Sequence, residues 1–537
     1  MRKVIAVASG TMLAAGLGAI APLNGAAAVN AGQDDNAAAV ARQFVKDNRA
    51  DVRGSSGDAY RMTDKITSGD DGAAIRYERT YRGLPVLGGD FVVHVTKNGR
   101  TDGVSVAQDR AIRVGTTPKV AKSAAKRKAR HGATTATVRR VAEPKLVVDA
   151  RDGRPALAWQ TVVRGVQADG QTPSRQQVVT DARTGKVRSA AETITTPIAL
   201  DQRTSPGELR GTRHRAAEAG TGTGIFVGEV EIDTTSGANG FEMIDSSRGD
   251  GETCDMNNTQ ASCETFVDDD NAWGDGTNSD RASAGVDAHF GAATTFDYFK
   301  EVHGRDGIFG DGTGVPSRVH YGDNYVNAFW DGSQMTYGDG EGNAAPLVEL
   351  DVAGHEMSHG VTENTAGLEY SGDAGGLNES TSDIFGTMVE FHANNANDKP
   401  DFLIGELIDI NGDGTPLRYM DEPSKDGASY DCWSEEVPGS DPHYSSGVGN
   451  HFFFLLANGS GESEFGNSPT CDGSTVSGIG NEAAAAIWFK ALNEYMVSTE
   501  TYAQAREHTV QAATDLYGDG SAEVKAVEAA WTAVSVS

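Results

Sequence analysis

Residues 355–359 read His-Glu-Met-Ser-His, two histidines four residues apart with a glutamate directly after the first. The apolar spacing of residues 346–364 predicts a helix with Pro346 at its first position, and residues four apart lie on the same helical face. Both imidazoles can therefore bind one metal ion, for which zinc is the typical choice. Glu356 lies about 100° round the helix from His355, where it can act on a metal-bound water without binding the metal.

A third ligand is expected from a second predicted helix, residues 374–396. Glu379 lies 20 residues after His359, and two histidines with one carboxylate form a zinc site that leaves one position open for water. Asp383 is one helical turn beyond Glu379, so that it can orient His355 through the second ring nitrogen. The three predicted zinc ligands are thus His355, His359 and Glu379.

The elements that must position these residues divide the acidic part of the chain into two lobes. Residues 224–345 are rich in Gly, Asp and Asn with short strand patterns, which predicts a β-rich lobe. Residues 346–537 predict an α-helical lobe, and the fold class is therefore α+β. A cleft between two such lobes is a usual place for a site. After the first two helices, further helices are predicted over 447–457, 478–497, 501–516 and 521–534.

The preceding part of the chain predicts two smaller units. Residues 29–115 have a short helical start at 37–46 and then alternating strand patterns, typical of a small α+β domain. Residues 116–198 have a basic helical segment followed by three strand-like runs, which indicates a second domain. Residues 199–223 are polar and contain several arginines, so we expect an exposed linker with the processing site.

The charge of the 537-residue chain is unevenly distributed. The net charge is −30, yet residues 1–215 hold 35 Lys and Arg against 20 Asp and Glu, and the remaining residues hold 11 against 56. The large negative total argues against nucleic acid as a partner. The split indicates two parts with different functions, and their opposite charges make them complementary.

The N-terminus has the pattern of a secretory signal peptide, residues 1–28. Arg2 and Lys3 precede an almost wholly apolar run at 4–23, and small residues follow at 25–28. An uncleaved membrane anchor is the alternative, since the run nearly reaches spanning length, although three glycines weaken it. We expect a secreted, extracellular, monomeric protein without membrane association after cleavage.

Four cysteines lie beyond residue 250, and an even number in a secreted protein predicts disulfide bonds. Three pairings are possible. Cys254–Cys263 and Cys432–Cys471 are favoured, because each pair flanks a polar, loop-like stretch that a local bridge would close.

Longer runs around these motifs resemble the thermolysin family of neutral metalloproteases. Residues 351–390 are similar to its zinc region, and residues 325–335 to its substrate-binding edge strand. Residues 441–447 resemble its second catalytic segment in the D-x-H form of pseudolysin-like members. Residues 512–518 are similar as well, and residues 76–90 resemble the family's propeptide signature. The resemblance spans most of both acidic lobes.

This resemblance implies a zinc metalloendopeptidase made as a zymogen, acting on internal bonds of protein and peptide substrates. Residues 29–215 would then be an inhibitory, fold-assisting propeptide. Glu356 would be the general base, and Tyr370 and His443 would hydrogen-bond the oxyanion while Asp441 holds His443. The implied substrate-binding residues are Asn327, Ala328 and Arg418.

The resemblance also implies structural calcium, for which carboxylate oxygens are suitable ligands. Leu403 stands where two-calcium members carry a glutamate, although its backbone carbonyl can still bind an ion. We therefore expect one calcium at this locus. The candidate calcium ligands are Asp351, Glu390, Asp401, Leu403 and Glu406.

Two other functions remain in view, a single-zinc exopeptidase of narrow action and a catalytically inactive extracellular binding module. An aminopeptidase needs acidic groups to hold the substrate's amine, whereas the strand at Asn327 favours extended peptides. An inactive module would be expected to lose Glu356, Tyr370 or His443, and all three are present.

Overall fold

The computed structural model describes residues 26–67, 72–196 and 217–537. The predicted signal peptide lies outside these ranges except for its last three positions, which belong to helix α1 (Ala26–Asp47). None of the helices in the described ranges has the length and apolar character that a membrane span requires. Helix α1 begins well before the predicted helical start at residue 37.

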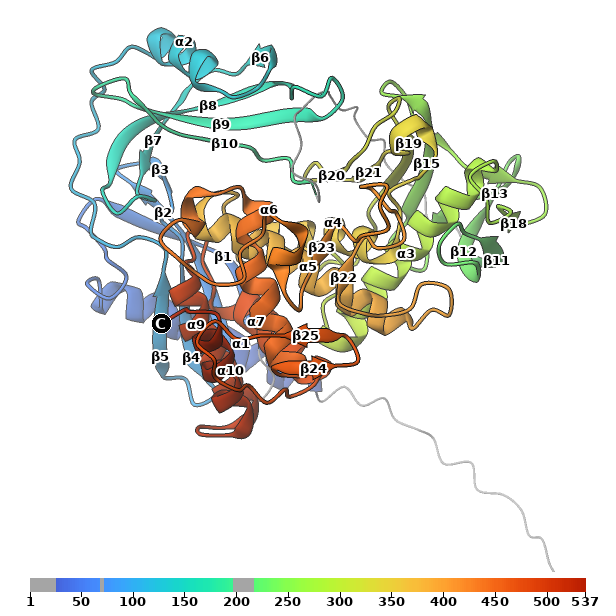
Figure 1. Ribbon diagram of the computed structural model, residues 1–537. Helices are drawn as coiled ribbons and strands as arrows, with labels where there is room; N and C mark the ends of the chain where they lie inside the picture. Colours follow the sequence, from blue (N-terminus) through green and yellow to red (C-terminus); the bar gives the residue numbers. More distant parts are fainter. Residues whose placement is uncertain (1–25, 68–71, 197–216) are drawn as a thin grey trace, which may run out of the picture.

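A ten-stranded sheet forms most of the N-terminal part, with strand order β10-β9-β8-β7-β3-β2-β4-β5 (Figure 1). Strand β1 pairs with β2, and β6 pairs with β8. The parallel pairing of β3 with β7 joins the two predicted N-terminal units in one sheet. The strands are β1 (Asp58–Thr67), β2 (Gly72–Tyr81), β3 (Leu84–Leu87), β4 (Phe91–Thr96), β5 (Thr101–Val106), β6 (Thr137–Val141), β7 (Lys145–Asp149), β8 (Ala156–Val166), β9 (Pro173–Asp181) and β10 (Val187–Ala191).

Two helices cover this sheet. Ala41 and Val45 of α1 are buried against Ile75, Phe91 and Val93 of strands β2 and β4. Helix α2 (Lys122–Gly132) turns its buried Ala125 and Ala129 toward β8 and β9. The alternating strands and the small-residue faces of both helices explain the two-layer arrangement.

The predicted β-rich lobe contains two sheets, with orders β17-β13-β12-β11-β18 and β14-β15-β19-β21-β20, and β16 pairs with β15. Strand β11 occupies residues 217–223, so these residues are not part of the predicted linker, whose remainder at 199–216 lies outside the described residues. Glycine-rich β11 lacks the apolar alternation that predicts strands. The strands are β11 (Ala217–Thr223), β12 (Glu229–Gly237), β13 (Gly240–Glu242), β14 (Ile244–Asp245), β15 (Gly251–Thr259), β16 (Glu264–Thr265), β17 (Val267–Asp268), β18 (Ala272–Trp273), β19 (Ser317–Tyr321), β20 (Ala328–Trp330) and β21 (Met335–Tyr337).

The same lobe contains a long helix, α3 (Arg281–His303), where mostly β structure is predicted. Buried residues occur on every side of α3, so its sequence has no single apolar stripe. Its end signals are present, because Asp280 accepts from the Ala282 amide and Gly304 adopts the left-handed conformation. The prediction failed because a helix buried all round has no amphipathic period.

The C-terminal lobe is helical as predicted, and the α+β fold is confirmed. Pro346 is not in the first of these helices, because residues 345 and 347 hydrogen-bond to residues 339 and 338 and delay the helix start to Leu350. The helices are α4 (Leu350–Glu363), α5 (Gly372–Ala393), α6 (Pro442–Ser445), α7 (Gly447–Asn458), α8 (Asn481–Lys490) with a π-helical turn at Ala491–Tyr495, α9 (Tyr502–Tyr517) and α10 (Ala522–Ala533). Two short hairpins complete the lobe, β22 (Leu403–Ile404) with β23 (Arg418–Tyr419) and β24 (Gly461–Ser463) with β25 (Gly466–Ser468).

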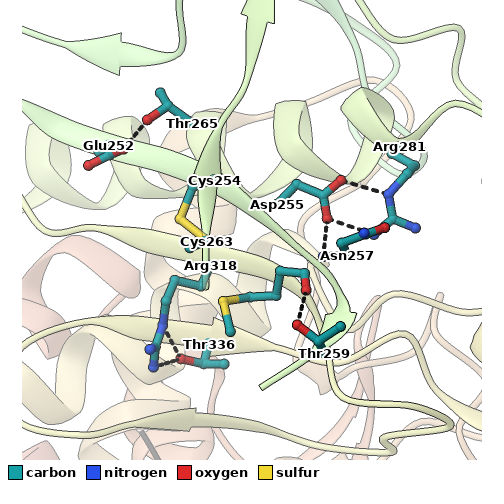
Figure 2. The surroundings of a disulfide bond; sticks show 11 residues. Glu252, Cys254, Asp255, Asn257, Thr259, Cys263, Thr265, Arg281, Arg318 and Thr336 are labelled. Atoms are coloured by element: carbon teal, nitrogen blue, oxygen red, sulfur yellow. Dashed lines mark hydrogen bonds and ion pairs between the residues drawn. A yellow bond between two sulfur atoms is a disulfide. The ribbon is translucent and has the colours of Figure 1, made fainter. Parts of the chain in front are cut away.

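Both favoured disulfide pairings are present. Cys254 of β15 bonds to Cys263, with Cα atoms 5.5 Å apart. Figure 2 shows this bridge beside the Asp255–Arg281 ion pair, which ties the same strand to α3 at 2.6 Å. Cys432 bonds to Cys471 with a Cα separation of 6.2 Å. Both pairings were predicted because each pair flanks a polar, loop-like stretch, although the partners are 9 residues apart in the first bridge and 39 in the second.

Candidate metal centre and peptide-binding cleft

Helices α4 and α5 bring the predicted zinc ligands together, and glycines allow the helices to approach closely. A Cβ atom on Gly386 would lie 2.4 Å from the Asp351 carbonyl oxygen, and one on Gly354 would lie 3.0 Å from Gly386 Cα. Such an approach excludes larger side chains at both positions. The close crossing turns Glu379 of α5 toward the histidine face of α4.

His355, His359 and Glu379 converge on one buried point. The two Nε2 atoms are 3.1 Å apart. Glu379 Oε2 lies 3.4 Å from His355 Nε2, and its Oε1 lies 3.5 Å from His359 Nε2. Glu379 Oε2 has no hydrogen-bond partner among the described residues. Two imidazole nitrogens and an orphaned carboxylate oxygen aimed at one point match the donor set of a zinc ion.

The second nitrogen of each histidine is held by a neighbour on α5. Asp383 Oδ1 lies 2.7 Å from His355 Nδ1, and Asn378 Oδ1 lies 2.8 Å from His359 Nδ1. These contacts fix both ring orientations and leave Nε2 for the metal. Asn378 was not identified from the sequence, although it directly precedes Glu379.

Arg418 forms two hydrogen bonds to the Asp383 carboxylate. Its Nε donates to Asp383 Oδ2 at 2.8 Å and its Nη2 to Oδ1 at 2.6 Å. Burial acts to raise the pKa of Asp383, but Arg418 and His355 outweigh it and hold that pKa well below its ordinary value. Asp383 is therefore a charged anchor for His355, and the predicted carbonyl contact of Arg418 remains a prediction.

Glu356 of helix α4 lies beside the ligand cluster. The side chain is fully buried, and neither carboxylate oxygen has a hydrogen-bond partner among the described residues. Burial, reinforced by the nearby Glu379 carboxylate, raises its pKa well above the ordinary value. A buried, unpaired carboxylate next to a candidate metal point is suited to accept and return a proton.

Tyr370 and His443 form the opposite wall. The Tyr370 hydroxyl donates to Glu379 and lies 3.3 Å from His443 Nε2. Asp441 Oδ1 lies 2.6 Å from His443 Nδ1 and also accepts from the His443 amide. Burial acts to lower the pKa of His443, but Glu379 and Asp441 raise it overall. This wall therefore presents hydrogen-bond donors toward the metal point.

Strand β20 lies at the edge of its sheet, next to this centre. Asn327 is buried, and its side-chain oxygen accepts from the Ala328 amide at 3.0 Å. Trp330 of β20 exchanges both backbone hydrogen bonds with Thr195, so a segment of the N-terminal part occupies the strand's open edge. Strand addition of this kind is a common way to bind an extended peptide.

A second acidic cluster combines a residue directly before α4 with residues that follow α5. Ligand oxygens of Glu349, Asp398 and Glu406 lie within 4.8 Å of one another. Oδ1 of Asp398 and Oε2 of Glu406 have no hydrogen-bond partner among the described residues. Neither Glu349 nor Asp398 was identified from the sequence, because they are far apart along the chain. Glu349 directly precedes α4, whereas Asp398 follows the end of α5.

The predicted calcium ligands surround this cluster. Burial together with neighbouring carboxylates raises the pKa of Asp351 to about 8, of Glu390 to about 12 and of Glu406 to about 9. Asp401 accepts from the Leu403 amide and donates its own amide to Glu390. Carboxylates held this close without a cation repel one another, so the arrangement fits a hard divalent ion.

Comparison with known proteins identifies the family. The family model described as "Thermolysin metallopeptidase, catalytic domain" matches residues 219–363, and "Thermolysin metallopeptidase, alpha-helical domain" matches residues 366–536. The fungalysin/thermolysin propeptide motif matches residues 58–107. Thermolysin of Alicyclobacillus acidocaldarius is 35% identical over 493 residues, which cover 86% of this chain and 83% of that protein. The chain belongs to the thermolysin family.

The chain spans less than two thirds of the length of two other relatives in the thermolysin family. The transglutaminase-activating metalloprotease of Streptomyces mobaraensis is 50% identical over 474 residues, which cover 86% of this chain but 59% of that protein. Bacillolysin of Bacillus cereus is 41% identical over 329 residues, covering 60% and 55% respectively. Among solved structures, the precursor of protealysin from Serratia proteamaculans aligns with a TM-score of 0.41 at 31% identity, covering 53% of this chain and 87% of that one.

Proposed function

We propose that this chain is the zymogen of a secreted zinc metalloendopeptidase, with residues 1–28 as signal peptide and residues 29–215 as inhibitory propeptide. The observation that carries the proposal is the convergence of His355, His359 and Glu379, with an orphaned Glu356 beside them and an extended segment on β20. The β-rich lobe at 224–345 and the helical lobe at 346–537 would form the mature enzyme.

Zinc at the three ligands would supply a Lewis acid that acidifies a water and polarises the substrate carbonyl. Glu356 would take a proton from the attacking water and deliver it to the nitrogen of the leaving amine. Its raised pKa in the buried site is consistent with a group that carries a proton between the two steps.

Tyr370 and His443 would donate hydrogen bonds to the carbonyl oxygen as it gains negative charge. Asp441 would keep His443 protonated, and Asp383 with Arg418 would hold the ligand face of α4 in place. Asn327 and Ala328 would bind the substrate backbone by strand addition. Donors already oriented toward the oxygen need no rearrangement during the reaction, which is their main contribution to the rate.

We also propose that calcium binds among Asp351, Glu390, Asp401, Leu403 and Glu406, with Glu349 and Asp398 as further carboxylates. Asp351 lies on α4 and Glu390 on α5, so one ion would connect the two helices that carry the zinc ligands. The unpaired oxygens of Asp398 and Glu406 support this proposal.

An endopeptidase is favoured over an exopeptidase because the segment on β20 is held through its backbone, inside the chain rather than at a terminus. The bound segment extends from Thr193 through Thr196, and no free terminus is required to hold it. Internally quenched peptides with both ends blocked should therefore be cut. Cleavage of free-ended dipeptides alone would identify an exopeptidase instead.

The decisive variant is Glu356→Gln, which retains the zinc ligands but removes the base. We expect normal zinc content with peptide hydrolysis reduced by about 1000-fold or more. Glu363→Gln is the matched control, since Glu363 lies on the same helix and accepts from the Trp330 indole, a bond that an amide oxygen preserves. Substantial turnover by Glu356→Gln would contradict this assignment of the base.

A further inference from the structure

His320 of β19 has a backbone conformation that few residues with a side chain adopt. Its φ is 57°, in the left-handed region that favours glycine, and the residue is buried. Such a conformation is unfavourable for a residue with a Cβ atom, and it persists only where the surrounding structure requires it, often at functional sites. The conformation therefore points to a requirement that the imidazole of His320 fulfils.

Both ring nitrogens of His320 face hydrogen-bond acceptors. Nδ1 lies 2.8 and 2.9 Å from the two carboxylate oxygens of Asp339, and Nε2 lies 2.9 Å from the Arg281 carbonyl oxygen. Neither a carbonyl nor an ionised carboxylate can donate a hydrogen bond, so both ring nitrogens carry hydrogen. The imidazole is then a buried cation paired with the buried Asp339 carboxylate, and separating two such charges is costly.

Further contacts hold both partners of the imidazole in place. Asn258 Nδ2 donates to Asp339 Oδ2 at 2.6 Å, and Arg281 Nη1 donates to Asn258 Oδ1 at 2.9 Å. Arg281, at the start of α3, is itself paired with Asp255 of β15 (Figure 2). The imidazole of His320 is thus anchored to α3 and β15 through Arg281, and to the chain after β21 through Asp339.

The residues on either side of Asp339 bind the segment that contains Asn327. Gly338 donates its amide to the Asn327 carbonyl at 2.9 Å, and Gly340 donates its amide to the Tyr325 carbonyl at 3.0 Å. A Cβ atom on Gly338 would lie 2.1 Å from the Tyr325 carbonyl oxygen, so the two backbones are in close contact. A shift of Asp339 would therefore move the backbone that leads into β20.

The side chain of His320 extends the connection between two paired strands. The parallel pairing of β19 with β21 joins Ser317 to Met335 and Arg318 to Thr336. Asp339 lies two residues beyond the end of β21. Past the two backbone pairs, the His320 side chain provides the contact from β19 to the segment after β21. The left-handed backbone at His320 therefore accompanies a change from backbone pairing to a side-chain ion pair.

We propose that His320 and Asp339 are positioning residues for the substrate, because their ion pair sets the place of residues 325–327 and so of the edge at which β20 binds a peptide backbone. This inference rests on the proposed function, in which Asn327 and Ala328 bind that backbone. Both residues of the pair act through this segment, and neither is one of the three candidate zinc ligands. Hydrogen bonds from this edge hold the substrate and the transition state alike, so loss of the ion pair should raise KM and leave kcat nearly unchanged.

The test uses two variants of the full-length chain, activated after expression. Asp339→Asn keeps the shape of the side chain but removes its charge. His320→Gly suits the left-handed backbone yet removes both imidazole contacts, so it separates the role of the side chain from that of the backbone. On a long, internally quenched peptide we expect KM to rise about tenfold or more in both variants, with kcat within about threefold of wild type. A blocked dipeptide substrate, too short to pair along β20, should show a much smaller change, and zinc content should remain normal.

His289→Ala is the matched control for a general loss of stability. His289 is also a buried histidine of this lobe with two partners, the Thr253 hydroxyl at 2.7 Å and the Asp233 carbonyl at 2.8 Å. These partners belong to β15 and β12, away from the segment that leads into β20. The control should lower the thermal stability of the activated enzyme while KM for the long peptide stays at the wild-type value.

The outcomes separate this inference from the proposed function. An unchanged KM for the long peptide in both variants would overturn the inference and leave the proposed function intact. An equal loss of kcat on the long peptide and on the dipeptide would also overturn it, because that result indicates a general loss of structure. If His320→Gly gives no folded enzyme, Asp339→Asn decides alone. If the activated wild-type enzyme cuts no peptide, the proposed function itself fails.

Discussion

Arg76 of β2 connects the N-terminal sheet to the helical lobe through backbone carbonyls. Its Nη2 donates to Leu492 O at 3.0 Å and Asn493 O at 2.6 Å, and its Nη1 donates to Met496 O at 3.0 Å. Nε also donates to Asn493 O at 3.1 Å. These acceptors lie at the end of the π-helical turn after α8, where helix carbonyls lack intrahelical partners. Burial lowers the pKa of Arg76 to about 10, so the side chain is still charged at neutral pH.

Arg76→Met keeps much of the apolar stem but removes every one of these donors. Truncating one partner of a buried, hydrogen-bonded charge typically weakens an interface by about 2–5 kcal/mol. Water can solvate the freed carbonyls once the two parts separate, so we take the lower range of about 2–4 kcal/mol. At about 1.4 kcal/mol for each factor of ten, this range predicts a 30-fold to 1000-fold, order-of-magnitude rise in the dissociation constant.

The assay is inhibition of activated enzyme by added propeptide, with association and dissociation rates measured separately. Arg61→Met is the control, because Arg61 is exposed on the neighbouring strand and its surface ion pair with Glu78 contributes at most about 1 kcal/mol. Both variants lose one positive charge, so long-range attraction changes equally. The loss should appear in the dissociation rate. Equal dissociation rates for the two variants, with both propeptides folded by circular dichroism, would refute the reasoning.

Three further predictions concern ions, pH and salt. Removing calcium while zinc is kept constant should shorten the thermal half-life of the mature enzyme several-fold. The Asp398→Asn variant should depend less on calcium. Equal half-lives of the wild-type enzyme with and without calcium would contradict the calcium proposal. Burial, with His508, Arg76 and Lys490 nearby, lowers the pKa of His94 to about 3 in the zymogen. His94 is therefore neutral when bound, whereas in the free propeptide it takes up a proton below about pH 6.5. The affinity of the propeptide for the enzyme should then fall by up to about tenfold per pH unit below 6.5, and the fall should be smaller for the His94→Gln variant. The association rate of propeptide should decrease steeply with ionic strength while dissociation changes little, and a salt-independent association rate would refute charge attraction.

The structure brings the three predicted zinc ligands together, and this proximity could be predicted because they lie close together in sequence on two helices. Four-residue spacing places His355 and His359 on one face, and one turn separates Glu379 from Asp383, so local geometry was enough. The helix start at Leu350 was missed, because tertiary hydrogen bonds at residues 345–347 outweigh the local preference of Pro346. Long-range contacts are therefore where prediction failed.

Other misses have the same origin. Helix α3 was missed because it is buried on every side, which removes the periodic signal. Glu349 and Asp398 are separated by 49 positions, and only the folded α4–α5 pair brings their oxygens near Glu406. The occupied edge of β20 depends on a pairing between Thr195 and Trp330, two residues whose types carry no sign of it. None of these contacts leaves a pattern in the neighbouring sequence.

The charge asymmetry and the docking contacts also act at different distances. Among the contacts between the two parts, Arg151 forms an ion pair with Glu369 at 3.1 Å, whereas Arg76 and Arg175 donate to backbone carbonyls. A carbonyl acceptor is present at every residue, so the negative composition of the enzyme does not specify where these arginines bind. The opposite net charges therefore act mainly during approach, where salt screens them. Once docked, buried hydrogen bonds hold the complex with little influence of salt, which is why association and dissociation should respond differently.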